Sequence, residues 1–337
     1  MKTLAKKDLI KAINIWTDKF EVLSPTKTTH GDCIFDKFQE NKFTTDYKKP
    51  PLSPKASFFP HTEVIFKVEK NEYHEVVSAK KMLLFGIRSC DMMGLLQAAS
   101  FMSRDKKDVY YNAKRDMAAT VVMACPGPQN ETCFCTTTLS GPVAKKGFDL
   151  QLYDMDNVYL VEVGTPRGEK LLSGIPLADV GEDLARRPIE EFKQKAIRNI
   201  PEVKSVIKAM NKLKDHKADE KVWDSFGQKC ITCGGCAFVC PTCTCFNVYD
   251  HQSSPGNGLR SRTWDACLYG GFTREASGHN PRANQALRLK RRHEHKLLDY
   301  NNIDIQDGLC GCVGCGRCSD YCPVHIGTLE VVKAIAG

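Results

Sequence analysis

Two copies of one cysteine spacing limit what this chain can fold into more than any other feature. The spacing is C-x2-C-x2-C-x3-C followed by proline, and both copies are complete. In such a frame three thiolates surround one [4Fe-4S] cubane, and the fourth thiolate, displaced past a turn of helix, ligates the other cluster. Zinc sites, the main alternative, use paired C-x2-C units in separate halves.

The spacing therefore predicts two [4Fe-4S] clusters with crossed fourth ligands. The first set is Cys230, Cys233, Cys236 and Cys322, and the second is Cys312, Cys315, Cys318 and Cys240. Neither motif has a nucleophile and a base beside it. We interpret the two clusters as an electron path and not as a reactive centre.

The number of cysteines bears on the cellular compartment. The chain has 17 cysteines, and twelve of them follow residue 229. The residues up to Trp16 mix lysines with apolar residues, which predicts an amphipathic helix and not a secretory signal. Thiols stay reduced in the cytoplasm, so we expect metal ligation there and not disulfides. No apolar run reaches the roughly 18 residues of a membrane span. The formal charge of +8 overstates the charge of the loaded protein, because a cubane with four thiolates is an anion.

The first two hundred residues alternate strand-like and helix-like patterns, which predicts a mixed α/β domain over residues 1–214. The predicted strands are Glu63 to Val68, Met82 to Ile87, Thr120 to Ala124 and Val158 to Val163, and the predicted helices are Met92 to Met102 and Ile189 to Lys214 with a break near Pro201. A polar linker leads into a second domain over residues 222–337. Its two motifs lie 71 residues apart, in a stretch that looks mostly helical, so we expect an α-helical ferredoxin-like domain.

Four further cysteines fall in the N-terminal domain, at Cys90, Cys125, Cys133 and Cys135. Cys90 and Cys125 each follow a strand-like run, and ligands collect at the carboxyl ends of strands in α/β sheets. If the two strands are neighbours, both thiols face one crevice. We predict a third [4Fe-4S] cluster here, with zinc or four buried free thiols as the alternatives. Asp91 is interpreted as a helix N-cap, or alternatively as an oxygen ligand.

Other signals are weaker. Cys243, Cys245 and Cys267 lack an obvious fourth ligand, so packing is favoured over a further metal. Between Arg260 and Lys296, nine basic residues face three acidic ones. A solvated helix face, compensation of cluster charge and a docking surface all remain open, while nucleic acid is not expected because aromatics are not interleaved. Neither a G-x-G-x-x-G nor a P-loop frame occurs, so electrons should enter and leave through partner proteins.

Several segments resemble one family. They are Cys240-Pro-Thr-Cys-Thr-Cys-Phe-Asn-Val, Arg262-Thr-Trp-Asp-Ala-Cys, Gly278-His-Asn-Pro-Arg, Gly314-Cys-Gly-Arg-Cys before Cys322-Pro-Val, and Phe85-Gly-Ile-Arg-Ser-Cys-Asp. With them the chain resembles, over roughly residues 80 to 335, the iron-sulfur (4Fe-4S dicluster) electron-transfer subunit that anaerobic sulfite reductases share with cytosolic hydrogenases or sulfhydrogenases, where it is the β subunit. Related subunits serve flavin-based complexes attached to heterodisulfide reductase.

The resemblance implies a non-catalytic electron-transfer subunit. Such a protein relays electrons between a flavin subunit that oxidises NAD(P)H and a separate catalytic subunit, and the resemblance leaves the catalytic partner unidentified. An alternative of a different class is a redox enzyme with a substrate-reactive cluster in the N-terminal domain. An iron with an open site would distinguish that enzyme from a relay, in which every cluster has four protein ligands.

Overall fold

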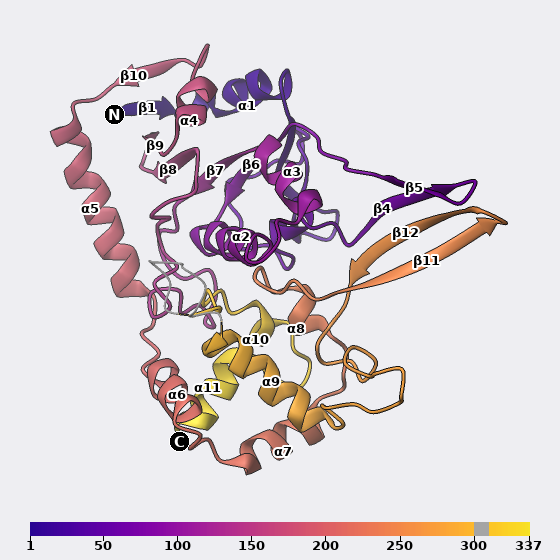
Figure 1. The fold of residues 1–337 in the computed structure, drawn as a ribbon. Coiled ribbons are helices and arrows are strands. Elements are labelled where there is room, and N and C mark those ends of the chain that lie inside the picture. Colours follow the sequence, from indigo (N-terminus) through magenta and orange to yellow (C-terminus); the bar gives the residue numbers. More distant parts are fainter. Residues whose placement is uncertain (300–309) are drawn as a thin grey trace.

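The computed structural model describes residues 1–299 and 310–337, and its N-terminal part is built on one eight-stranded sheet (Figure 1). The strand order is β10-β1-β9-β8-β7-β6-β2-β3. The strands are β1 (Lys2–Ala5), β2 (Glu21–Lys27), β3 (Cys33–Lys37), β6 (Met82–Ile87), β7 (Ala118–Met123), β8 (Leu150–Asp154), β9 (Val158–Val163) and β10 (Leu177–Asp179). β2, β6, β7 and β8 are parallel, and the flanking strands are antiparallel.

Helices cover both faces of this sheet. α1 (Leu9–Thr17) packs on one face in a buried cluster that includes Leu83 of β6. α2 (Ser89–Phe101) and α3 (Val109–Met117) cover the opposite face, where the next residue, Leu84, is buried. Successive side chains of a strand point to opposite faces, so β6 is apolar throughout and contributes to both cores.

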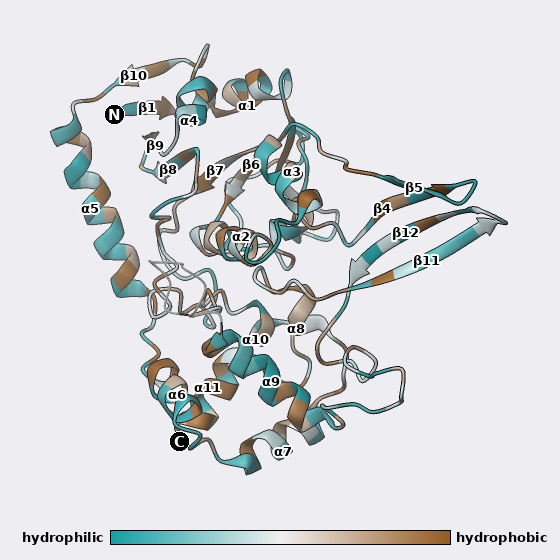
Figure 2. Ribbon diagram, in the orientation of Figure 1, coloured by the Kyte–Doolittle hydropathy of each residue, from teal (hydrophilic) through white to brown (hydrophobic). Residues whose placement is uncertain are grey.

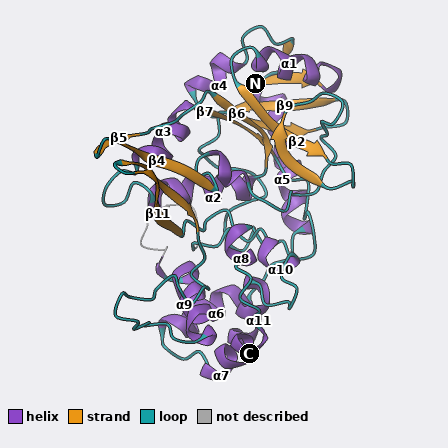
Figure 3. Ribbon diagram, turned by 90° about the vertical axis from the view of Figure 1, so that its right-hand side faces the viewer, coloured by secondary structure: helices purple, strands orange, loops and turns teal. Residues whose placement is uncertain are grey.

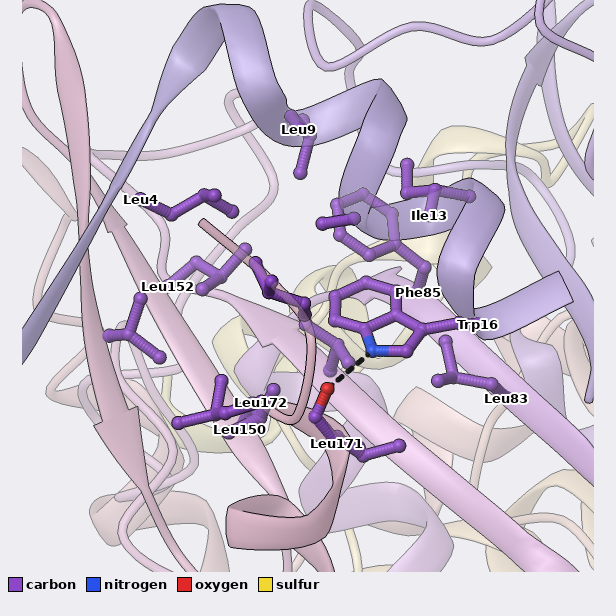
Figure 4. Close-up of a cluster of buried hydrophobic side chains, with 14 of the residues drawn as sticks. Leu4, Leu9, Ile13, Trp16, Leu83, Phe85, Leu150, Leu152, Leu171 and Leu172 are labelled. Atoms are coloured by element: carbon purple, nitrogen blue, oxygen red, sulfur yellow. Dashed lines mark hydrogen bonds between the residues drawn. The ribbon is translucent and has the colours of Figure 1, made fainter. Parts of the chain in front are cut away.

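Figure 4 shows the core beneath α1. The indole of Trp16 is buried there and donates a hydrogen bond of 2.8 Å to the carbonyl of Leu171, which supplies the acceptor that a buried tryptophan needs. The remaining helical segments of this part are η1 (Lys6–Asp8), η2 (Pro54–Ser57), α4 (Pro166–Leu171) and α5 (Glu182–Asn199). Among the described residues, no helix has both the length and the apolar character needed to cross a membrane.

A second sheet joins segments that are far apart in the sequence. Its order is β11-β12-β4-β5, with β4 (Thr62–Glu69), β5 (Glu72–Glu75), β11 (Phe246–Ser254) and β12 (Asn257–Trp264). The two hairpins meet where β12 pairs antiparallel with β4. Figure 1 shows this sheet as an arm that projects from the body of the molecule. One hairpin comes from each side of the predicted domain boundary, and that boundary stays a prediction.

The C-terminal part is mostly helical, and Figure 3 shows its helices gathered at the end of the molecule away from the large sheet. The helices are α6 (Ser205–Lys214), α7 (Glu220–Lys229), α8 (Gly235–Phe238), α9 (Gln285–Leu297), α10 (Arg317–Asp320) and α11 (Thr328–Ala336). Trp223 of α7 is buried among apolar residues of α6 and α11. Figure 2 shows α9 as largely hydrophilic, although part of it is buried.

Sequence patterns located part of this fold. β4, β6, β7 and β9 coincide with the four predicted strands, α2 with the predicted helix, and α5 and α6 with the interrupted helical stretch. The helix predicted up to Trp16 is confirmed from Leu9, where α1 begins, and is wrong before it, because Lys2–Ala5 form the strand β1. The prediction of a mostly helical stretch between the motifs was also wrong. That stretch opens with β11 and β12, which pair with β4, and its residues 300–309 lie outside the described residues.

A buried ion pair joins the two parts of the molecule. Asp91 of α2 accepts two hydrogen bonds from the guanidinium of Arg317 in α10, at 2.6 and 3.0 Å, and both side chains are 0% exposed. Arg317 also donates from Nε to the carbonyl of Pro50 at 2.8 Å. The N-cap of α2 is Arg88, so the interpretation of Asp91 as the N-cap was wrong.

We expect Asp91→Asn to destabilise the protein by about 3–5 kcal/mol, because it leaves the Arg317 charge buried and uncompensated. The matched control is Asp250→Asn. Asp250 also forms a two-pronged pair with an arginine, Arg260, but its side chain is 61% exposed. The control should cost far less than the loss of the buried pair, since exposed ion pairs contribute little to stability. Anaerobic urea denaturation followed by circular dichroism measures both, and equal losses would contradict the structural role of the buried pair.

Candidate metal centres

A pocket at the surface of the C-terminal part gathers thiols from both cysteine motifs. It is lined by Cys230, Cys233, Cys236 and Cys322, together with Ile231, Gly234, Leu268, Leu289, Tyr321, Pro323, Val324 and Ile326. Gln285 donates a hydrogen bond of 3.0 Å to the sulfur of Cys230, and the backbone N–H of Ile326 donates to Cys322 at 3.4 Å. The four thiols are those that the crossed assignment places on one cluster. The pocket wall between them is apolar.

The other four motif cysteines are Cys240, Cys312, Cys315 and Cys318, of which Cys315 is buried and the rest are partly buried. Cys315 is 8% exposed, and burial raises the pKa of its thiol to about 11, with the nearby sulfurs of Cys240 and Cys318 adding to the rise. Burial also raises the pKa of the Cys312 thiol, and the nearby sulfurs of Cys318 and Cys315 add to the rise. Cys240 of the first motif is thus a neighbour of the second motif's thiols, as crossing requires.

The two motifs share a local geometry. Gly234 and Gly316 each follow the second cysteine of their motif, with φ of 71° and 73°, and each precedes a short helix, α8 or α10. Left-handed backbone of this kind favours glycine. A Cβ at Gly234 would lie 2.4 Å from the Tyr269 hydroxyl, and one at Gly316 would lie 2.5 Å from the Thr132 carbonyl oxygen. The left-handed backbone favours glycine at both positions, and at Gly316 the Thr132 backbone leaves no room for a side chain.

The four N-terminal cysteines form a third group. β6 and β7 are parallel neighbours, so Cys90 and Cys125 follow adjacent strands at one edge of the sheet. All four thiols, Cys90, Cys125, Cys133 and Cys135, are buried. Burial is the main reason that the pKa of Cys90, Cys125 and Cys135 is raised, and charges of other thiols in the group add to it.

This third group lies directly against the second motif. Cys90, Cys135 and Cys315 belong to one buried cluster of side chains. The ammonium of Lys49 contacts the sulfur of Cys133 at 3.7 Å and also donates a hydrogen bond to the carbonyl of Cys315. The sheet edge and the C-terminal motif therefore hold their thiols side by side.

Buried cations surround the three groups. They are Lys49, Lys55, Arg88, Arg292, Lys296 and Arg317, and each is at most 6% exposed. A buried cation is costly unless an anion compensates it. Lys49 pairs with Asp320 and Arg317 with Asp91. Arg88 and Arg292 form no ion pair with a carboxylate of the described residues, and the Nε of each lacks a hydrogen-bond partner there.

Those two guanidiniums test whether iron-sulfur clusters fit. Thiols are neutral and would leave both cations uncompensated, and burial raises the pKa of Cys236 to about 12 and so opposes the thiolate form. A cubane bound by four thiolates is anionic and supplies the missing negative charge. In the described part of the chain, no three His, Cys, Asp or Glu side chains converge on a single-ion site. The four ligands of a cubane bind four different iron atoms, so they need not converge on one point. The three groups of four cysteines therefore fit [4Fe-4S] clusters.

The three remaining cysteines of the C-terminal part divide between two contacts. Cys243 forms a hydrogen bond with the motif residue Cys240, and this contact raises the pKa of Cys243. Cys245 and Cys267 share another hydrogen bond, which lowers the pKa of Cys267 to about 6. These contacts agree with the packing interpretation of the three thiols, and a further metal on them stays untested.

The basic segment is partly internal. Arg292, His293 and Lys296 of α9 are buried, whereas Arg291 is 41% exposed at its side chain. A fully solvated helix face is therefore wrong for these three residues, and compensation of cluster charge and docking of a partner stay predictions for the segment. The sequence did not identify Lys49, Lys55 or Arg88 as parts of a site. Arg292 and Lys296 belong to the basic run that the sequence did single out, and Arg317 lies between two motif cysteines.

Comparison with known proteins agrees with this geometry. A family model described as a 4Fe-4S dicluster domain matches residues 229–326, which contain all eight motif cysteines. The sulfhydrogenase 2 subunit beta of Pyrococcus furiosus is 32% identical over 300 residues, which cover 88% of this chain and 86% of that protein. No solved structure matches. The chain thus carries two [4Fe-4S] clusters in a dicluster domain and belongs to the family of iron-sulfur subunits that includes the sulfhydrogenase beta subunit.

Proposed function

We propose that this chain relays electrons between an NAD(P)H-oxidising flavoprotein subunit and a separate catalytic subunit, as in sulfite reductase, hydrogenase or heterodisulfide-reductase complexes. The observation that carries the proposal is that three groups of four cysteines are neighbours. Cys236 of the first group lies near Cys318 of the second, and Cys315 of the second packs against Cys90 and Cys135 of the third. Such neighbouring groups form a path for electrons. The relative from Pyrococcus furiosus is itself named as a subunit, which supports a role within a complex.

The proposed ligand sets follow the crossed assignment. Cys230, Cys233, Cys236 and Cys322 hold the first cluster, and Cys312, Cys315, Cys318 and Cys240 hold the second. The shared pocket of Cys322 with the first motif supports the first set. The closeness of Cys240 to Cys315 supports the second.

A third [4Fe-4S] cluster on Cys90, Cys125, Cys133 and Cys135 extends the path into the N-terminal domain. Its support is the meeting of four buried thiols beside the unpaired Arg88. The contact of Cys90 and Cys135 with Cys315 supports a path in which the second cluster lies between the other two. Four thiols would complete the coordination of this cluster, which favours a relay over the alternative of a substrate-reactive cluster with an open iron.

One end of the path lies at the surface. Cys233 is exposed, and its neighbours Ile231 and Tyr321 are 58% and 48% exposed at the rim of the same pocket. In the second group Cys315 is buried, and in the third group all four thiols are buried. We infer that one partner exchanges electrons with the first cluster at this rim.

We expect Cys322→Ser to perturb the cluster of Cys230, Cys233 and Cys236, and Cys240→Ser to perturb the other cluster, because each fourth thiolate reaches across. EPR spectroscopy of the reduced variants measures this, with signals assigned from Cys233→Ser and Cys315→Ser. If Cys322→Ser alters only the signal that Cys315→Ser alters, each motif closes its own site and the crossed assignment is wrong.

Iron content tests the third cluster. The anaerobically purified chain should hold about twelve iron atoms, and Cys125→Ala should reduce this to about eight, because each cubane contributes four. Cys33→Ala is the control, since Cys33 lies in β3 outside the three groups and its loss should leave the iron content unchanged. About eight iron atoms in the unmodified chain would refute the third cluster. One zinc ion per chain beside those eight iron atoms would show that the four N-terminal cysteines form a zinc site instead.

The relay itself is tested by reconstitution. The isolated chain should neither oxidise NAD(P)H nor reduce sulfite, and its clusters should become reduced by NAD(P)H once the proposed flavoprotein partner is added. Bleaching of the cluster absorbance in the visible range follows the electron transfer. NAD(P)H oxidation by the flavin-free single chain would refute the relay.

A further inference from the structure

The buried face of α9 brings one arginine between the two motif clusters. Arg292 is 2% exposed, while its neighbour Arg291 faces outward and pairs with Asp299 at 2.5 Å. Adjacent residues of a helix point in different directions, so the two arginines have opposite surroundings. The same helix thus provides a buried charge and an exposed one at consecutive positions.

The contacts of Arg292 reach both cysteine motifs. Nη2 donates a hydrogen bond of 3.2 Å to the carbonyl of Cys236 in the first motif. Nη1 lies 3.4 Å from the hydroxyl oxygen of Thr328. Thr328 in turn contacts the sulfur of Cys318 in the second motif, through its hydroxyl at 3.4 Å and through its backbone N–H at 3.3 Å. One guanidinium therefore links a residue of each motif.

No protein anion neutralises this guanidinium within the described residues. It makes no ion pair there, and its Nε has no hydrogen-bond partner. The adjacent His293 lies 3.2 Å from Nη1, but burial and the charge of Arg292 lower its pKa to about 3, so it is neutral. The counter-charge that remains is that of the clusters themselves.

We propose that Arg292 is the shared counter-ion of the two motif clusters and that its charge raises the reduction potential of both. Each cluster takes up one electron without a bond being formed or broken in the protein, and its negative charge grows by one. A fixed cation nearby stabilises the more negative state, and it does so strongly where water is excluded. Arginine keeps this charge at every physiological pH.

Because Arg292 contacts residues of both motifs, its fixed charge acts on both clusters. Removing that charge should therefore shift both potentials in the same direction. This inference requires the two clusters of the dicluster domain but none of the proposed partners. If the role of Arg292 is refuted, the proposed relay is unaffected. If the relay is refuted, the role of Arg292 is unaffected.

The test is an EPR-monitored redox titration of the full chain with its clusters, using dithionite as the reductant. Arg292→Gln should lower both potentials so that the ratio of reduced to oxidised cluster at a fixed potential falls about tenfold, which is about 59 mV for one electron. Arg292→Lys keeps the charge and should stay near the unmodified protein. Arg291→Gln removes the same charge from the exposed side and should change neither potential.

Three results would overturn the proposal. One is an Arg292→Gln variant that binds both clusters and titrates like the unmodified protein. Another is an equal shift in Arg292→Lys and Arg292→Gln, which would point to packing and not to charge. The third applies if Arg292→Gln binds less iron than the unmodified protein. In that case Arg292→Lys should restore the iron content, because it keeps the charge. An Arg292→Lys variant that also binds less iron would exclude the role of charge.

Discussion

Positive charge buried beside clustered thiols is the interaction on which this structure depends. Six lysines and arginines are almost completely enclosed around three cysteine groups. Water would ordinarily solvate such charges, and burial without a partner is strongly unfavourable. The thiols face the opposite difficulty, since burial raises the pKa of Cys236 and Cys315 and so opposes the thiolates that iron requires. Once the clusters are bound, the buried cations stabilise the thiolates, and the negative charge of the clusters compensates the cations.

The cations differ in how much of their charge the clusters feel. Asp91 neutralises Arg317, and Asp320 lies 3.1 Å from Lys49, so these pairs act mainly as dipoles. Their fields fall off faster with distance than that of a lone charge. The Asp91–Arg317 pair instead joins α2 to α10 and fixes the sheet against the second motif. It secures the short separation between the N-terminal thiols and Cys315 that a relay needs.

The sequence predicted the candidate cluster ligands better than the residues that surround them. The motif spacing located eight thiols, and strand patterns placed Cys90 and Cys125 after β6 and β7, which are parallel neighbours. The hairpin of β11 and β12 was missed because its residues are exposed along most of β11 and lack the apolar alternation that marks a half-buried strand. That hairpin forms by pairing with β4, nearly two hundred residues earlier in the chain, and no local pattern carries such information.

Burial of the cations was equally hidden from the sequence. Arg291 and Arg292 are adjacent members of one basic run, yet only the second is enclosed, because the side of α9 that faces the motifs is set by packing of Leu289 and Leu297. Lys49 lies in a loop with no motif at all. A charge run by itself is usually a solvated face, and tertiary contacts decide which members turn inward.

The distribution of unpaired charge completes this picture. Within the described residues, Arg88 and Arg292 are the buried guanidiniums without a carboxylate partner, and they lie at different sites. Arg88 lies near Cys125 and Cys90 of the N-terminal group, whereas Arg292 lies between the two motifs. Lys55 is also enclosed, but burial lowers its pKa, so its charge is less secure than that of an arginine. One fixed charge therefore lies beside the N-terminal thiols and another beside the dicluster pair, so the proposed third cluster would have a counter-ion of its own.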